Sequence, residues 1–178
     1  MSSQLKLIVV VLLTALLIAC DGMPARRSHE QAKYQVLRIQ EDPQRNRLWL
    51  LDYEAVSLYD NTSGRLLRRI ALPDWAVAGR QFSCPPDLVL DRSGAAFVTS
   101  NVLPVLWRID GERLDVARLE LALDADQDKD FGFESLSFAA DGTLLARSGT
   151  QGSLWRIDPR SSSAQKLAPS SPGARCSR

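Results

Sequence analysis

Histidine is nearly missing from this chain of 178 residues: His29 is the only one, and it lies in a polar stretch ahead of the patterned sequence. A single histidine excludes histidine-rich metal sites and any Ser-His-Asp or Cys-His triad built into a core. The chain also lacks a Walker phosphate loop, a dinucleotide-binding glycine motif and a CxxC pair. An excess of one charge is lacking too, since 22 basic residues face 21 acidic ones. Such a chain has no basic footprint for nucleic acid.

The composition is that of an ordinary globular protein, with 45% hydrophobic and 24% charged residues. These values exclude wholesale disorder and a polytopic membrane protein. The length suits one domain with appendages. We expect four segments: a signal peptide over 1–19, a polar tether over 20–33, a repeat domain over 34–169, and a tail over 170–178.

An apolar run from Leu7 to Ala19 follows the weakly positive N-terminus. It is shorter than the roughly 20 residues that cross a bilayer, which is typical of a secretory signal. The residues Leu17 to Cys20 (LIAC) resemble the lipobox of bacterial lipoproteins. This resemblance implies cleavage before Cys20 and attachment of a diacylglyceryl group and fatty acids such as palmitate to that cysteine. Two or more acyl chains anchor a protein stably. Asp21 matches the residue that keeps such lipoproteins of enteric bacteria at the inner membrane, so the body would face the periplasm.

A repeat runs through the body of the chain. Leu106–Asp110 (LWRID) recurs 48 residues later as Leu154–Asp158, and a fainter copy ends at Asp60. Turn residues and an apolar strand precede each copy, and Gly, Asn and Asp permit the positive φ of tight hairpins. Each unit therefore predicts four strands. The predicted first strands are Val36–Ile39, Asp87–Leu90 and Ser135–Phe138, and the fourth are Leu66–Leu72, Leu114–Leu121 and Gln165–Ala168.

Four-stranded units of this length predict an all-β fold, a partial β-propeller of about three four-stranded antiparallel blades. Inner segments such as Leu48–Leu51 are apolar on both faces, as in a sheet covered on two sides. The runs Phe133–Leu144 and Pro86–Gly94 resemble blade starts of NHL-type and gluconolactonase-like propellers. The resemblance supports the fold. In enzymes of that type, carboxylate and asparagine side chains hold one divalent metal, and Glu134 and Asn101 match such positions loosely.

Three blades are fewer than the 4–8 of closed propellers, so the end blades should expose apolar faces. Four explanations stay open at this point. Two chains could join into a six-bladed ring, a separate partner could complete it, the chain's own termini could cap the arc, or the sequence could be a fragment.

An unusually acidic segment precedes the third unit. Alternating carboxylates suit calcium, but Lys129 replaces the glycine of a calcium loop, and a solvated loop is the simpler interpretation. The candidate metal ligands are Asp124, Asp126, Asp128, Asp130 and Glu134.

Aromatic and cysteine residues supply the remaining candidates. Trp75, Arg80 and Phe82 lie in the equivalent loop one unit earlier and form a candidate interaction face, unless the two aromatic side chains fill gaps between blades. Trp107 and Trp155 occupy repeated strand positions, which predicts core. Once Cys20 is lipidated, Cys84 and Cys176 remain as a possible disulfide in an oxidising periplasm.

The sequence as a whole favours a membrane-anchored periplasmic lipoprotein that acts as a noncatalytic protein-interaction or scaffold module. Its expected partners are the membrane, through the lipid, and another protein or a second copy of itself. No cofactor is expected beyond the candidate calcium. The alternative is a metal-dependent lactonase or ester hydrolase of the gluconolactonase-like type.

Overall fold

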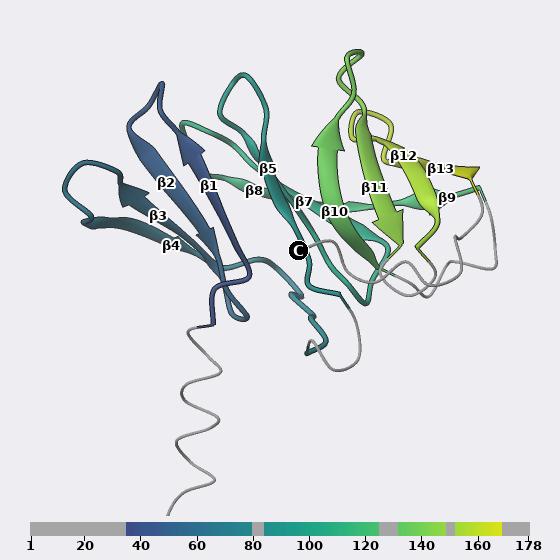
Figure 1. The fold of residues 1–178 in the computed structure, drawn as a ribbon, viewed down its shortest axis with the longest axis horizontal. Helices are drawn as coiled ribbons and strands as arrows, with labels where there is room; N and C mark the ends of the chain where they lie inside the picture. Colours follow the sequence, from purple (N-terminus) through teal and green to yellow (C-terminus); the bar gives the residue numbers. More distant parts are fainter. Residues whose placement is uncertain (1–34, 80–83, 125–131, 149–151, 169–178) are drawn as a thin grey trace, which may run out of the picture. The chain divides into compact units, whose positions relative to one another are not determined.

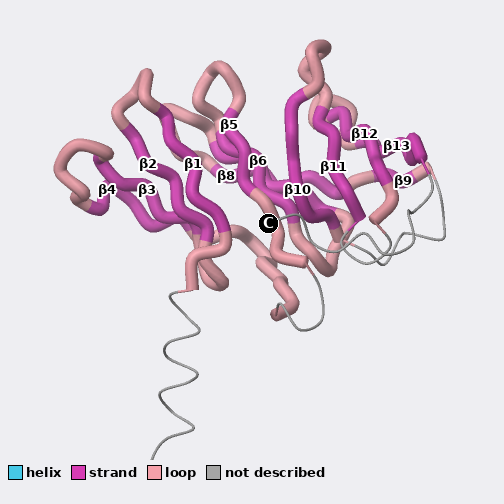
Figure 2. Tube along the Cα trace, viewed as in Figure 1, coloured by secondary structure: helices cyan, strands magenta, loops and turns pink. Residues whose placement is uncertain are grey.

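A computed structural model describes residues 35–79, 84–124, 132–148 and 152–168, which all belong to the second of two compact units, Tyr34–Arg178 (Figure 1). These residues form only strands, turns and loops (Figure 2). Within them, no helix is long and apolar enough to span a membrane. The prediction of an all-β fold is confirmed.

Three sheets follow one another along the chain, each an antiparallel meander in which successive strands pair. The first sheet contains β1 (Arg38–Asp42), β2 (Arg47–Leu51), β3 (Val56–Asp60) and β4 (Leu66–Ile70). The second contains β5 (Leu88–Leu90), β6 (Ala96–Thr99), β7 (Val105–Ile109) and β8 (Val116–Glu120). The third contains β10 (Phe133–Phe138), β11 (Leu144–Ser148), β12 (Leu154–Asp158) and β13 (Ser163–Ala168), with β9 (Ala122–Leu123) added in parallel to β13. The expected three blades are therefore present.

The hairpin between the first two strands of each sheet has the same construction. Its last turn residue has a positive φ, at Asn46, Gly94 and Gly142 respectively. In the first two hairpins an aspartate at the start of the turn also accepts a backbone bond, as where Asp91 Oδ1 accepts the amide of Ala95 at 2.9 Å. Asparagine and glycine tolerate this left-handed backbone, which is why these residues end the turns.

Two apolar cores lie between the sheets. The core between the first and second sheets includes the fully buried Trp49 and Trp107, and the core between the second and third includes Trp155 and Phe133. Because neighbouring residues of a strand point to opposite faces, the second sheet contributes to both cores. The predicted core positions of Trp107 and Trp155 are confirmed, since neither residue is exposed.

Some predicted strand bounds were wrong. The first strand starts and ends later than Val36–Ile39, at Arg38 and Asp42, because the turn that ends at Asn46 sets its hairpin register with β2. The fourth strand of the second unit is shorter than Leu114–Leu121. β9 was not predicted: its residues pair with Ser163 and Ala164 far along the chain, and so link the outer edges of the second and third sheets.

Candidate functional site

The hydrogen-bond register aligns the three sheets residue by residue, so that each position in one sheet has an equivalent in the others. One row holds the cross-strand pairs Ile39–Leu50, Leu88–Val98 and Leu136–Ala146. A second row holds Trp49–Leu58, Phe97–Arg108 and Leu145–Arg156. Comparing the exposure of equivalent residues therefore shows which sheet faces are covered.

The face of the first sheet that points away from the second sheet is open. Ile39 is 51% exposed, whereas its equivalents Leu88 and Leu136 are 0% and 6% exposed. Leu50 is half-buried, whereas Val98 is fully buried. We call this surface the open face of the first sheet; it includes Ile39, Glu41, Leu48, Leu50, Tyr59 and Leu66, together with the buried Ser57 and with Arg69, which donates to Ser57 Oγ.

The third sheet is open on the opposite side. Leu145 and Leu154 are half-buried there, whereas the equivalent residues of the second sheet, Phe97 and Leu106, are buried. The surface is more polar than the open face of the first sheet. We call it the open face of the third sheet; it includes Ser137, Leu145, Arg147, Leu154, Arg156 and Gln165, with the buried Glu134 opposite Arg147. The expected exposed faces at both ends of the array are thus present in the described residues.

A polar centre lies where the first strands of the sheets begin. Arg38, Asp87 and Glu134 occupy equivalent positions there, and β5 contacts both β1 and β10. The Asp87 carboxylate pairs with Arg38 Nε at 2.9 Å and accepts the amide of Leu136 at 2.7 Å. One side chain therefore ties the first strands of all three sheets together. Sequence reasoning missed Arg38 and Asp87 here, although a charged residue stands at the same point in each unit.

Glu134 is the member of this polar centre whose ionisation is unfavourable. It is 3% exposed, and burial, reinforced by the charge of Asp87, raises its pKa; Arg147 across the strand pair opposes this effect. A raised pKa in the folded state means that folding favours the protonated form.

The stability of the protein should therefore fall as the pH rises through the window above 4.5, because the unfolded chain releases this proton first. Glu134→Gln should flatten that fall. Turn aspartates such as Asp60 have lowered pKa values, owing to backbone hydrogen bonds, so their effect on stability falls at a more acidic pH. Chemical denaturation at several pH values would check this, and an unchanged slope in Glu134→Gln would contradict it.

Of the five candidate metal ligands, the structure describes Asp124 and Glu134, and these two lie far apart. Glu134 lies on β10 and Asp124 follows β9, at opposite edges of the same five-stranded sheet. Four strand spacings separate these edges by about 19 Å, too far for one ion. Asp124 Oδ1 instead accepts the amide of Lys166 at 2.9 Å. The other three, Asp126, Asp128 and Asp130, lie outside the described residues.

Asn101 does not complete a metal site either. Its Nδ2 donates to the carbonyls of Ala78 and Cys84, and its Oδ1 accepts the amide of Ala78, so this buried side chain clamps the ends of one loop. No group of three or more acidic, cysteine or histidine side chains among the described residues could hold a metal.

The candidate interaction face is described only at Trp75. This residue is half-buried, packs against the first core, and donates from Nε1 to the carbonyl of Tyr53 at 2.9 Å. Its ring meets Trp107 edge to face, with centroids 5.2 Å apart. Trp75 therefore fills a gap between sheets, the alternative given for it above. Arg80 and Phe82 lie outside the described residues.

Cys84 is disulfide-bonded, with a partner that lies outside the described residues. The other two cysteines, Cys20 and Cys176, both lie there. The pairing of Cys84 with Cys176 therefore stays a prediction, as does lipidation at Cys20.

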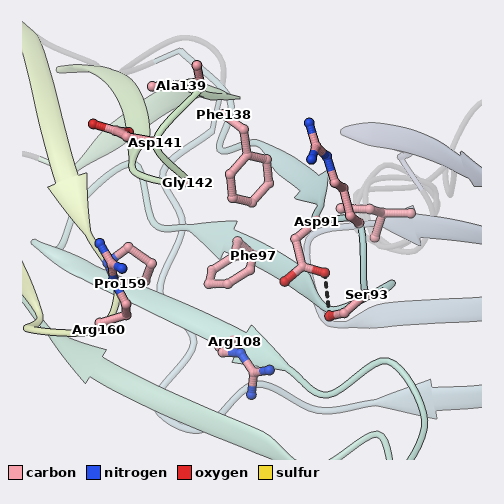
Figure 3. A pocket seen from close by; sticks show the side chains of 13 residues that line it. Asp91, Ser93, Phe97, Arg108, Phe138, Ala139, Asp141, Gly142, Pro159 and Arg160 are labelled. Carbon is pink, nitrogen blue, oxygen red and sulfur yellow. Dashed lines mark hydrogen bonds between the residues drawn. The ribbon is translucent and has the colours of Figure 1, made fainter.

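A cavity of about 930 Å³ opens at the hairpin ends of the second and third sheets (Figure 3). Phe97 and Phe138 meet edge to face in it, with centroids 5.6 Å apart, and Arg108 lines it beside them. Asp91 bonds to its own turn, including Ser93 Oγ at 2.6 Å. The cavity thus marks the seam between two packed sheets and shows which side chains meet across it.

Comparison with known proteins supports the fold alone. The sequence matches no protein-family model and no curated protein. The structure is similar to virginiamycin B lyase from Staphylococcus aureus, solved with quinupristin, with 19% identity, 79% of this chain and 43% of that chain covered, and a TM-score of 0.58. It is also similar to the extracellular domain of a putative one-component system from B. thetaiotaomicron, with 20% identity, 76% and 18% coverage, and a TM-score of 0.52.

The chain thus spans less than half the length of these propellers. The described residues therefore form about three blades of a β-propeller.

Proposed function

We propose that this chain is a lipid-anchored, periplasm-facing module without catalytic activity, which binds another polypeptide through the open faces of its first and third sheets. The observation that carries the proposal is the exposure of Ile39 at a position that is buried in both other sheets. Apolar sheet faces of this kind mark association sites in soluble proteins. Leu145 supports the same conclusion at the other end of the array.

The lipobox-like LIAC segment and Asp21 support an envelope location, at the inner membrane. One structural neighbour is the extracellular domain of a putative one-component system, a setting in which a propeller acts outside the cytoplasm. An anchor confines the module to the membrane surface, which raises its effective concentration toward partners held there.

Docking should protect the open face of the first sheet. We expect Ile39→Cys, in the full chain in isolated membranes, to react with a maleimide several-fold more slowly than Asn61→Cys in the exposed β3–β4 turn. A chain with nothing docked on its open faces would leave both thiols accessible to the maleimide. Equal labelling rates in the membrane would contradict the proposed function, whatever the identity of the partner.

A further inference from the structure

We infer that the partner is a second copy of this chain: the open face of the third sheet of each copy docks on the open face of the first sheet of the other, which closes a ring of six sheets. This inference rests on the proposed function and names the partner.

The two open faces are the two halves of an interface that the chain already makes twice. Between the first and second sheets, Trp49 and Val56 pack against the face that carries Val98. Between the second and third, Phe97 and Leu106 pack against the face that carries Ala146. On the open face of the third sheet, Leu145 and Leu154 are the equivalents of Trp49 and Val56. On the open face of the first sheet, Leu50 is the equivalent of Val98 and Ala146.

Charge complementarity favours the same pairing. Across the seam of the second and third sheets, Arg108 and Phe138 line one cavity. Their equivalents at the open faces are Arg156 and Glu41, both exposed and neither in an ion pair within the described part of the chain. A docked second copy brings these opposite charges to one seam. Opposite charges at an interface select the partner and fix the register.

The polar centre gains a cation in the same arrangement. In the ring, Arg38 of the second copy lies on the sheet after the one that carries Glu134. Within one chain, Arg38 lies on the sheet before the one that carries Asp87 and pairs with it. The buried carboxylate of Glu134 then has a basic neighbour on each side, because Arg147 lies across the strand pair.

Symmetry allows the ring to close. A contact between two different faces closes when the rotation between copies completes a circle, and six sheets fall within the 4–8 of closed propellers. Rotation about the ring axis leaves the first strands of both copies entering from one side. Both chains can therefore be anchored in the same membrane.

The test is charge reversal in the full chain, extracted in mild detergent and analysed by sedimentation velocity. Glu41→Arg and Arg156→Glu should each weaken the two-chain complex about tenfold or more, because each places like charges at the seam. The double variant should restore it. Asp115→Arg, on the β7–β8 turn away from both open faces, is the matched control and should leave association unchanged.

Single reversals that leave a two-chain complex intact would overturn this pairing of faces. Protection of Ile39→Cys in membranes together with a purified chain that stays single would overturn the second copy as partner and leave the proposed function standing. If Ile39→Cys is not protected in membranes and the purified chains do not associate, both the proposed function and the second copy as partner are contradicted.

Discussion

Replacing Trp107 by alanine is expected to lower the free energy of unfolding by about 3–5 kcal/mol, the usual cost of removing a large buried aromatic side chain. Trp107 is fully buried in the first core. Its Nε1 donates to the carbonyl of Pro73 at 2.9 Å, and its ring packs against Trp75. The substitution leaves a cavity between two sheets and an acceptor without its donor. Denaturant unfolding followed by circular dichroism would measure the loss.

Trp107→Phe is the matched control for this prediction. It keeps most of the apolar volume and loses the bond to Pro73, so we expect a smaller cost of about 1–2 kcal/mol. An alanine variant as stable as the phenylalanine variant would show that the first core does not hold the sheets together.

Asp87→Ala should lower the free energy of unfolding by about 2–4 kcal/mol, because it strips two buried amides of their acceptor and Arg38 of its ion-pair partner. The carboxylate accepts the amides of Leu136 and Leu88 and pairs with Arg38. Two of these donors belong to the sheets on either side of its own. Loss of the bonds to Asp87 should loosen the packing of all three sheets at the end where the first strands begin.

Arg38→Ala separates the contribution of the amide bonds from that of the ion pair. The Arg38 side chain is 48% exposed, and partly exposed ion pairs contribute less than about 1 kcal/mol. We therefore expect Arg38→Ala to cost far less than Asp87→Ala in the same denaturation experiment. Equal costs would mean that the ion pair, and not the bond to Leu136, joins the sheets.

The architecture was predictable from the sequence because it repeats. The spacing of Leu106–Asp110 and Leu154–Asp158 places each segment in the third strand of its sheet, as the structure shows. The turns were predictable from glycine and aspartate. Asn46 was the less obvious case, and its role at the end of the first turn shifted the bounds of β1.

Pairings between distant parts of the chain were not predictable in this way. β9 is only two residues long, and its partner strand lies some forty residues further on. The polar centre likewise depends on three charged residues that meet only once the sheets pack. The separation of Asp124 and Glu134 was not predictable for the same reason: they are ten positions apart in sequence but at opposite edges of a sheet.

The open faces were predictable in outline, from the number of units, but not in detail. That Ile39 is exposed where Leu88 and Leu136 are buried became evident only from the register. The same register identifies Glu41 and Arg156 as the charged pair of the closing seam, which no local sequence pattern indicates.

Native mass spectrometry of the full chain, released from mild detergent at micromolar concentration, tests the central claim most directly. The open faces of the first and third sheets predict a particle of two chains. A particle that contains one chain would contradict the account, because both open faces would then be stable in contact with solvent.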